Sequence, residues 1–237
     1  LIRSYLQAVV GSWAAELAGQ TAPALDVQAR TRFNEANDSH YYLVPGVIVT
    51  IMTMIGALLT SLVMAREYER GTLESLFVTP VGSGEILTAK AATNFLLGMV
   101  SLAISMVFAA FVFDIPIRGS LLLLLAVSAL FLIVALGLGL VISTATKNQF
   151  LACQFAIMGT FMPALMLSGF LYDILNMPPA VRAVTYLIPA RYYVTLLQTL
   201  FLAGDIPSVI IPCCITLGVF AVVLMSIARL KAPKSLE

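Results

Sequence analysis

Five long apolar stretches, separated by short polar segments, dominate the pattern of this chain. They run over residues 42–65, 91–113, 120–144, 149–171 and 206–228, and each exceeds the ~20 residues that a helix needs to cross a bilayer. In hydrocarbon, only helices and closed barrels satisfy every backbone hydrogen-bonding group. Because these stretches are continuously apolar rather than alternating, the pattern predicts an all-α polytopic membrane protein with five transmembrane helices.

Composition agrees with a membrane location. Hydrophobic residues make up 60% of the chain and charged residues 11%, and the mean hydropathy is +1.00. Ordinary soluble domains carry roughly 25% charged residues, and a soluble protein of this length could not cover so much apolar surface. The net charge is +1 and no Lys/Arg-rich run is present, so nothing indicates a nucleic-acid partner.

Lys and Arg are distributed unequally between the two sides of the predicted spans. Seven cations fall on one side: Arg66, Arg70, Lys90, Lys147, Arg229, Lys231 and Lys234. The opposite short loops hold three: Arg118, Arg182 and Arg191. Because cytoplasmic loops carry the excess of Lys and Arg, we expect a cytoplasmic C-terminus and an outer location for residues 1–41.

Residues 1–41 differ in character from the rest of the chain. Apolar residues recur at helical spacing from Leu6 to Leu17, Pro23 breaks the pattern, and residues 27–33 alternate as a short strand would. We interpret 1–41 as the C-terminal part of an α/β extracytoplasmic domain and 42–237 as the transmembrane domain. One more helix before this segment would give six spans, so we expect that a first helix precedes the chain.

The outer segment over residues 172–204 is more than a simple loop. It contains several prolines and the aromatic residues Tyr186, Tyr192 and Tyr193, and neither half reaches spanning length without crossing Arg182 or Arg191. Two short half-helices re-entering the outer leaflet fit this pattern, with the tyrosines at the headgroup level. An interfacial loop is the alternative. In the fourth span, Pro163 predicts a kink, which is either a gating hinge or static.

The predicted spans contain no Asp, Glu, Lys, Arg or His. Ion-coupled transporters place ionisable groups in mid-membrane, so the sequence argues against secondary active transport, and equally against intramembrane proteolysis. The three cysteines show no metal-ligand spacing, and we expect no metal site. No phosphate-binding loop is present; Gly137 and Gly139 in the third span are better explained as small residues that allow close helix contact.

The most informative polar segment is residues 66–80, which read R-E-Y-E-R-G-T-L-E-S-L-F-V-T-P directly after the first span. Leu73, Leu76 and Phe77 stand at i, i+3 and i+4, which gives a short helix one apolar face. Gly71 permits a tight corner before this helix, and Pro80 ends it. Such a helix either docks a soluble partner or rests on lipid alone.

This segment resembles the R-E-x-E-x-G-T-x-E-x-L-x-x-T-P signature of the ABC-2-type permease family. Further similarity lies in Val44-Pro45-Gly46, in residues 136–143, in Leu167-Ser168-Gly169-Phe170 with Met177-Pro178, and in Ile188-Pro189-Ala190-Arg191-Tyr192. The likeness runs from about residue 34 to the C-terminus. It is closest to bacterial inner-membrane exporter permeases with a large periplasmic domain between their first two helices, a multidrug-efflux-like subgroup.

The resemblance implies a coupling helix at about residues 69–79 that lies in a groove of an ATPase. The implied ATPase-coupling residues are Glu69, Arg70, Thr72, Leu73, Glu74, Leu76, Phe77, Thr79 and Pro80, and those of the re-entrant outer gate are Ser168, Gly169, Phe170, Met177, Pro178, Pro189, Arg191 and Tyr192. Family members pair with ABC ATPase subunits, with a second permease copy or homologue, and often with a periplasmic membrane-fusion adaptor.

The expected function is therefore that of the permease subunit of an ATP-driven exporter in the bacterial inner membrane. The chain itself is expected to be no enzyme and to bind no cofactor, with ATP and magnesium held by the partner ATPase. An uncharged pathway suits hydrophobic or amphipathic cargo, such as drug-like or lipid-like molecules. The alternatives are a structural membrane anchor of another complex and a lipid-processing enzyme, for which no nucleophile, base or metal cluster can be assembled.

Overall fold

The computed structural model describes residues 10, 11, 13, 40–71, 83–115 and 117–231. By its internal contacts the chain divides into Leu1–Asp38 and Ser39–Glu237, and all the predicted spans belong to the second unit. The strand expected over residues 27–33, and the expected coupling helix from Thr72 onward, lie outside the described residues.

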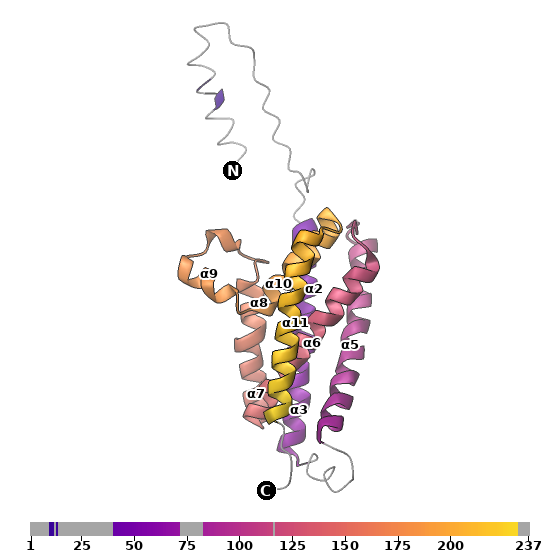
Figure 1. The fold of residues 1–237 in the computed structure, drawn as a ribbon, viewed down its shortest axis with the longest axis vertical. Coiled ribbons are helices and arrows are strands. Elements are labelled where there is room, and N and C mark those ends of the chain that lie inside the picture. The colour runs from indigo at the N-terminus through magenta and orange to yellow at the C-terminus, as the bar shows by residue number, and fades with distance from the viewer. Residues whose placement is uncertain (1–9, 12, 14–39, 72–82, 116, 232–237) are drawn as a thin grey trace. The chain divides into compact units, whose positions relative to one another are not determined.

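Among the described residues, five helical segments are long and apolar enough to cross a membrane, which confirms the predicted number and approximate positions. They cover Leu43–Glu69, Thr88–Phe111, Leu121–Thr146, Gln149–Leu167 and Pro207–Lys231. The described residues contain no strand, so the all-α class is confirmed for this part of the chain. Figure 1 shows these segments as a bundle of long helices.

Two of the five spans are interrupted by a wider, π-helical turn. The first span consists of α2 (His40–Thr53), η1 (Met54–Leu59) and α3 (Thr60–Glu69), and the fourth of α7 (Gln149–Ala156), η2 (Ile157–Phe161) and α8 (Met162–Leu167). The others are continuous: α5 (Ser83–Phe111), α6 (Leu121–Thr146) and α11 (Pro207–Lys231). The turn η2 precedes Pro163, which has no N–H to donate to the carbonyl of Gly159 in a regular helix.

The fourth span ends four residues earlier than predicted. Apolar residues continue to Leu171, but α8 stops at Leu167 because Gly169 adopts a φ of +90°. That left-handed conformation is accessible to glycine and ends helices. A hydropathy profile does not detect this helix end, because the apolar residues Phe170 and Leu171 follow Gly169.

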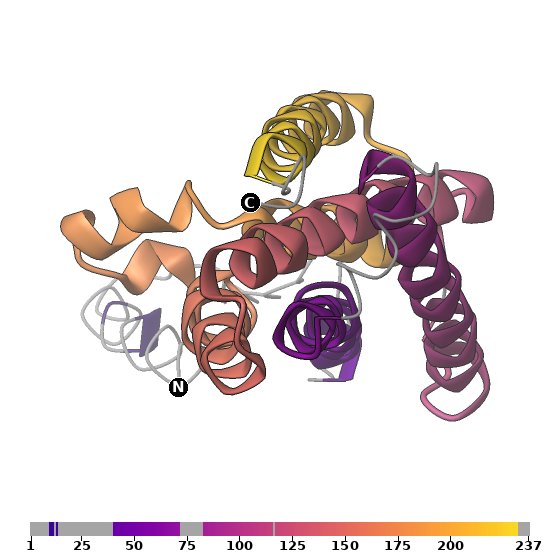
Figure 2. The same cartoon turned by 90° about the horizontal axis from the view of Figure 1, so that it is seen from below.

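The third span, α6, is the central helix of the bundle. It packs against α11, α3, η1, α5, α7 and the outer helix α10 (Pro189–Gln198). Figure 2 shows α6 between α11 on one side and the first span on the other. A helix surrounded in this way is apolar on every face, which explains the uninterrupted hydrophobic sequence of α6.

Glycines of α6 bring neighbouring backbones close, as the sequence predicts. A Cβ added at Gly139 would lie 2.6 Å from the carbonyl oxygen of Ala57 and 3.0 Å from the backbone nitrogen of Ser61. A Cβ at Gly137 would lie 3.0 Å from the Cβ of Leu224. Small residues at such crossings allow the van der Waals contact that drives helix association in lipid.

Replacing Gly139 with alanine should therefore destabilise the bundle. The new methyl group meets backbone atoms that cannot rotate away, and we expect a loss of about 1–3 kcal/mol in the free energy of unfolding. Gly218→Ala is the matched control, because a Cβ at Gly218 has no neighbour within 4 Å. Unfolding in mixed detergent micelles measures both; equal stability of the two variants would contradict the close packing.

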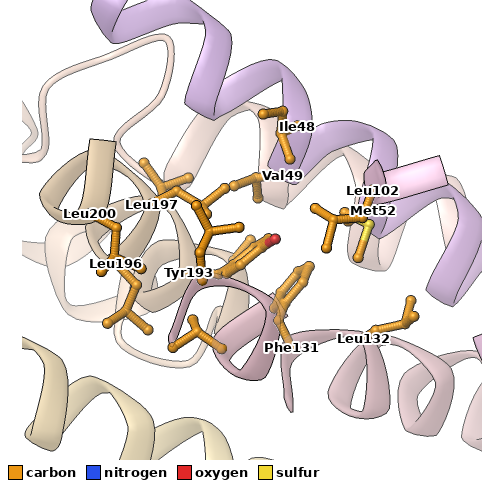
Figure 3. Close-up of a cluster of buried hydrophobic side chains, with 14 of the residues drawn as sticks. Ile48, Val49, Met52, Leu102, Phe131, Leu132, Tyr193, Leu196, Leu197 and Leu200 are labelled. Atoms are coloured by element: carbon orange, nitrogen blue, oxygen red, sulfur yellow. The ribbon is translucent and has the colours of Figure 1, made fainter. Parts of the chain in front are cut away.

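A buried cluster anchors α10 among the spans (Figure 3). The ring of Tyr193 stacks on that of Phe131 with centroids 4.1 Å apart and planes 14° apart, and its hydroxyl donates to Ser128 Oγ at 2.8 Å. The surrounding apolar side chains are Ile48, Val49, Met52, Leu102, Leu132, Leu196, Leu197 and Leu200. The expected headgroup position of Tyr193 is therefore wrong: this tyrosine is fully buried, with its hydroxyl satisfied inside the protein.

Candidate functional site

The end of α3 that the sequence assigns to the cytoplasm carries the charged residues of the resemblance. The helix includes Arg66, Glu67 and Glu69 in its last turns and ends at Glu69. Arg70 follows in a helical conformation and is exposed, and Gly71 has a φ of +67°. Glycine adopts this conformation without the penalty that a Cβ brings, so the expected corner at Gly71 is confirmed.

Glu67 ties this end of α3 to the second span. Lys90 Nζ in α5 donates to Glu67 Oε1 and forms an ion pair with it. The side chain of Glu67 is 19% exposed and that of Lys90 37%. Because the pair is partly buried, dissolved salt screens its attraction less than that of an ion pair on the surface. In the sequence, Lys90 stands out only as a positive loop residue, although an acid and a base at the facing ends of consecutive spans are a signal for such a pair.

Glu69 ties the same end of α3 to the fourth span. Its Oε2 accepts a hydrogen bond from the backbone N–H of Gln149 at 2.9 Å. The neighbouring N–H of Leu151 is capped by the side chain of Asn148 at 3.1 Å. A carboxylate is favourable at a helix N-terminus. The structure thus gives Glu69 a contact within its own chain, whereas its predicted contact with an ATPase stays a prediction.

Two further polar contacts lie deeper along α3. The amide Nδ2 of Asn94 in α5 donates to Thr60 Oγ1 at 3.0 Å, and Ser61 Oγ donates to the carbonyl oxygen of Ala152 in α7 at 3.3 Å. Hydrogen bonds between membrane helices contribute about 0.6 kcal/mol on average. With the contacts of Glu67 and Glu69, α3 is held to α5 at two levels and to α7 at two levels.

The other predicted coupling residues follow Gly71, where this described stretch of the chain ends. They lie outside the described residues: Thr72, Leu73, Glu74, Leu76, Phe77, Thr79 and Pro80. Their roles stay predictions.

At the opposite end, the first group of predicted gate residues packs against α2. Ser168 and Phe170 are buried, and Gly169 provides the turn described above. The ring of Phe170 lies so close to Gly46 that an added Cβ would be 1.8 Å from its Cδ2. Gly46 therefore makes room for Phe170, which locks the end of the fourth span onto α2.

The second group of predicted gate residues forms a tied turn between two short helices. Met177 and Pro178 lead into α9 (Pro179–Thr185), and Pro189 begins α10. The guanidinium of Arg191 lies 3.9 Å from the ring centroid of Tyr186 and donates to Thr185 Oγ1, while Tyr192 Oη donates to the carbonyl oxygen of Tyr186 at 3.0 Å.

Tyr193 lies next to this turn in sequence but is buried against Ser128, seven residues into α6. Seven residues of helix correspond to about 10 Å along its axis. This depth supports a re-entrant arrangement of α9 and α10, which stays a proposal.

Replacing Arg191 with alanine should loosen this turn. The cation–π contact and the hydrogen bond to Thr185 together contribute about 1–2 kcal/mol, so the free energy of unfolding should fall by that amount. Arg182→Ala in α9, where the side chain is exposed, is the matched control. Thermal unfolding followed by a thiol-reactive dye on the three partly buried free cysteines measures both; a loss that is equal in the two variants counts against the tied turn.

A family model described as ABC-2 type transporter matches residues 16–202. Over 240 residues, the chain is 45% identical to the "Probable multidrug ABC transporter permease YbhS" of Escherichia coli, covering 100% of this chain and 64% of that protein.

Two other Escherichia coli proteins are similar at lower identity. The "Probable multidrug ABC transporter permease YbhR" is 30% identical over 204 residues, covering 84% of this chain and 54% of that protein. The "Inner membrane transport permease YhhJ" is 27% identical over 236 residues, covering 99% of this chain and 63% of that protein. The chain thus spans between 54% and 64% of the length of these three relatives.

Proposed function

The chain belongs to the ABC-2 type transporter family, and we propose that it is the membrane permease subunit of an exporter driven by ATP hydrolysis in a partner chain. Its place is the bacterial inner membrane, with the C-terminus in the cytoplasm. The partners are ABC ATPase subunits and a second permease copy or homologue. A periplasmic membrane-fusion adaptor is a further partner that the resemblance implies.

The observation that carries this proposal is the contrast between the interior of the spans and the end of α3. Within the described spans, the buried polar side chains are hydroxyls and one amide: Thr53, Thr60, Ser61, Asn94, Ser128, Ser143, Thr144 and Thr160. None of these groups is a proton or sodium coupling site of the ionisable kind. Charged contacts gather instead at Glu67, Lys90 and Glu69, where a force applied from outside the membrane can act.

In the proposed mechanism, ATP binding draws two ATPase subunits together and moves the coupling segment after Gly71. The end of α3 moves with it. Because Glu67 holds α5 and Glu69 holds the start of α7, the first, second and fourth spans shift as a unit. The outer helix α10 packs against α2 of the first span and α8 of the fourth, and its movement would open the path for cargo.

The substrate class follows from the lining that the spans can offer. Ionic cargo in a low-dielectric path needs paired charges or hydrogen bonds to replace its water, and the buried polar groups of the described spans are hydroxyls and one amide, none of them charged. Hydrophobic or amphipathic molecules of drug-like or lipid-like character meet no such penalty.

Efflux of an amphipathic dye tests the proposal. Everted inner-membrane vesicles that contain the protein with its native partners should accumulate Hoechst 33342 when ATP is added. Vanadate should stop this accumulation, whereas a protonophore should not. Accumulation that continues with vanadate and collapses with the protonophore would show that energy comes from an ion gradient instead.

A further inference from the structure

A cavity of about 90 Å³ lies between the first, third and fourth spans and the turn that leads into α10. Its walls come from segments that are distant in sequence, among them Thr53 at the end of α2, Phe131 and Ala135 in α6, Gly159 and Thr160 in η2, Ala164 in α8, and residues 187–190 at the turn into α10. Thr53 stands ten residues from the start of the first span, which is about 15 Å of helix. The cavity is therefore at mid-membrane depth.

Two of the three spans that line the cavity, the first and the fourth, are irregular at this level, whereas α6 is regular. The π-helical turn η1 begins directly after Thr53, and η2 contains Gly159 and Thr160. The two turns contact each other. Such turns put an extra residue into a helix and occur frequently at functional sites. The other three spans are continuous helices, so crossing the membrane does not by itself require such turns. Two of them lie side by side at this one cavity.

The cavity wall is mostly apolar and offers hydrogen-bond acceptors. Thr53 Oγ1 donates its proton to the carbonyl oxygen of Val49 at 2.8 Å, and Thr160 Oγ1 donates to that of Ala156 at 2.5 Å. Each hydroxyl has one proton and two lone pairs, so both threonines retain lone pairs for a ligand and no proton. The lining includes no ionisable side chain. A neutral ligand that donates a hydrogen bond fits this wall, and an anion does not.

The cavity opens to the outside of the chain. A Cβ built at Gly159 has no atom within 4 Å, and the side chain of Leu187 is 75% exposed. An enclosed apolar cavity of about 150 Å³ holds a benzene molecule. The smaller volume here accommodates a few methylene groups or part of a ring, and the remainder of a longer molecule would extend through the opening beside Gly159.

From these observations we infer that the cavity binds the hydroxyl-bearing end of a neutral amphiphile, with Thr53 and Thr160 as hydrogen-bond acceptors. Its role as a cargo site rests on the function proposed above, whereas binding itself does not. The turn before α10 forms one wall, so a displacement of α10 would open or close the site.

Photolabelling locates the ligand directly. The probe is 3-azioctanol, an alkanol with a photoreactive diazirine, added to the protein in lipid nanodiscs without ATP or ATPase. Peptide mass spectrometry should place the main adducts on residues that line the cavity. Gly159→Leu places a side chain at the opening, where a Cβ has no neighbour within 4 Å, and should reduce these adducts at least about tenfold, which corresponds to about 1.4 kcal/mol of binding. Gly218→Leu, at an equally open position in α11, should leave them unchanged.

A second variant tests the role of the hydroxyl. Thr53→Val keeps the shape and removes the acceptor, so it should lower labelling by the alkanol about fivefold, the effect of one net hydrogen bond. Labelling by a diazirine-bearing alkane should stay the same. Adducts spread evenly over the exposed surfaces of the spans, or equal labelling of Gly159→Leu and Gly218→Leu, would overturn the inference. Because no ATP is present, that result is distinguishable from a failure of ATP-driven transport.

Discussion

Replacing Lys90 with glutamate is expected to lower the number of substrate molecules exported per ATP hydrolysed about tenfold. The substitution places two carboxylates side by side where Lys90 now pairs with Glu67. Like charges repel at this partly buried position, at a cost of about 1–3 kcal/mol. Since the pair joins α3 to α5, its loss lets the end of α3 move without the second span. Dye export and phosphate release, measured together in proteoliposomes of the assembled exporter, give the ratio.

The double exchange Glu67→Lys with Lys90→Glu separates coupling from simple damage. It restores the opposite charges with their positions reversed, and most of the ratio should return. Lys231→Glu, an exposed charge at the end of α11, should change the ratio little. If the double exchange is as impaired as the single variant while the ATPase remains bound, the ion pair does not transmit the movement.

Phe77→Asp is expected to have the largest effect on assembly. On the helix that the sequence predicts after Gly71, Phe77 shares an apolar face with Leu73 and Leu76, and the family resemblance places this face in a groove of the ATPase. Burying a carboxylate there removes an aromatic anchor and adds an unpaired charge. Interface anchors of this kind contribute about 2–4 kcal/mol, so affinity for the ATPase should fall by a factor of about 30 to 1,000.

Co-purification of the ATPase with tagged permease, together with the rate of ATP hydrolysis, measures this loss. Ser75→Asp is the matched control: it introduces the same charge two residues away, off the predicted apolar face. It should retain the ATPase. Equal loss in both variants would indicate a general intolerance of charge in the segment, and no loss in either would mean that the helix rests on lipid alone.

The spans could be predicted from the sequence because their length and continuous apolarity are properties of single segments. In bilayer hydrocarbon a run of about 20 or more residues without a charge has one stable conformation, and the structure places five helices where the runs are. The fourth span ends at Leu167 instead of the predicted residue 171, because the positive φ of Gly169 ends the helix. A hydropathy profile carries no signal for such an angle, although a glycine near the end of a span marks a position where a helix can end.

Contacts between spans could not be predicted in the same way. The central helix α6 is apolar all round, so its sequence does not tell which face meets which neighbour. The burial of Tyr193 against Ser128 and Phe131 could therefore not be predicted, and the aromatic pattern pointed to the headgroup level instead. The pairing of Glu67 with Lys90 depends on the rotation of α5 relative to α3, which the sequence does not show either. The wider turns η1 and η2 have no distinct sequence pattern beyond Pro163.

A photoreactive amino acid at position 74, in place of Glu74, tests the central claim most directly. In intact cells the crosslinked product should contain an ABC ATPase, and its yield should change when ATP hydrolysis is blocked with vanadate. A product that contains only lipid or a protein without nucleotide-hydrolysing activity would contradict the proposed function, as would labelling of this position by a membrane-impermeant reagent from the periplasmic side.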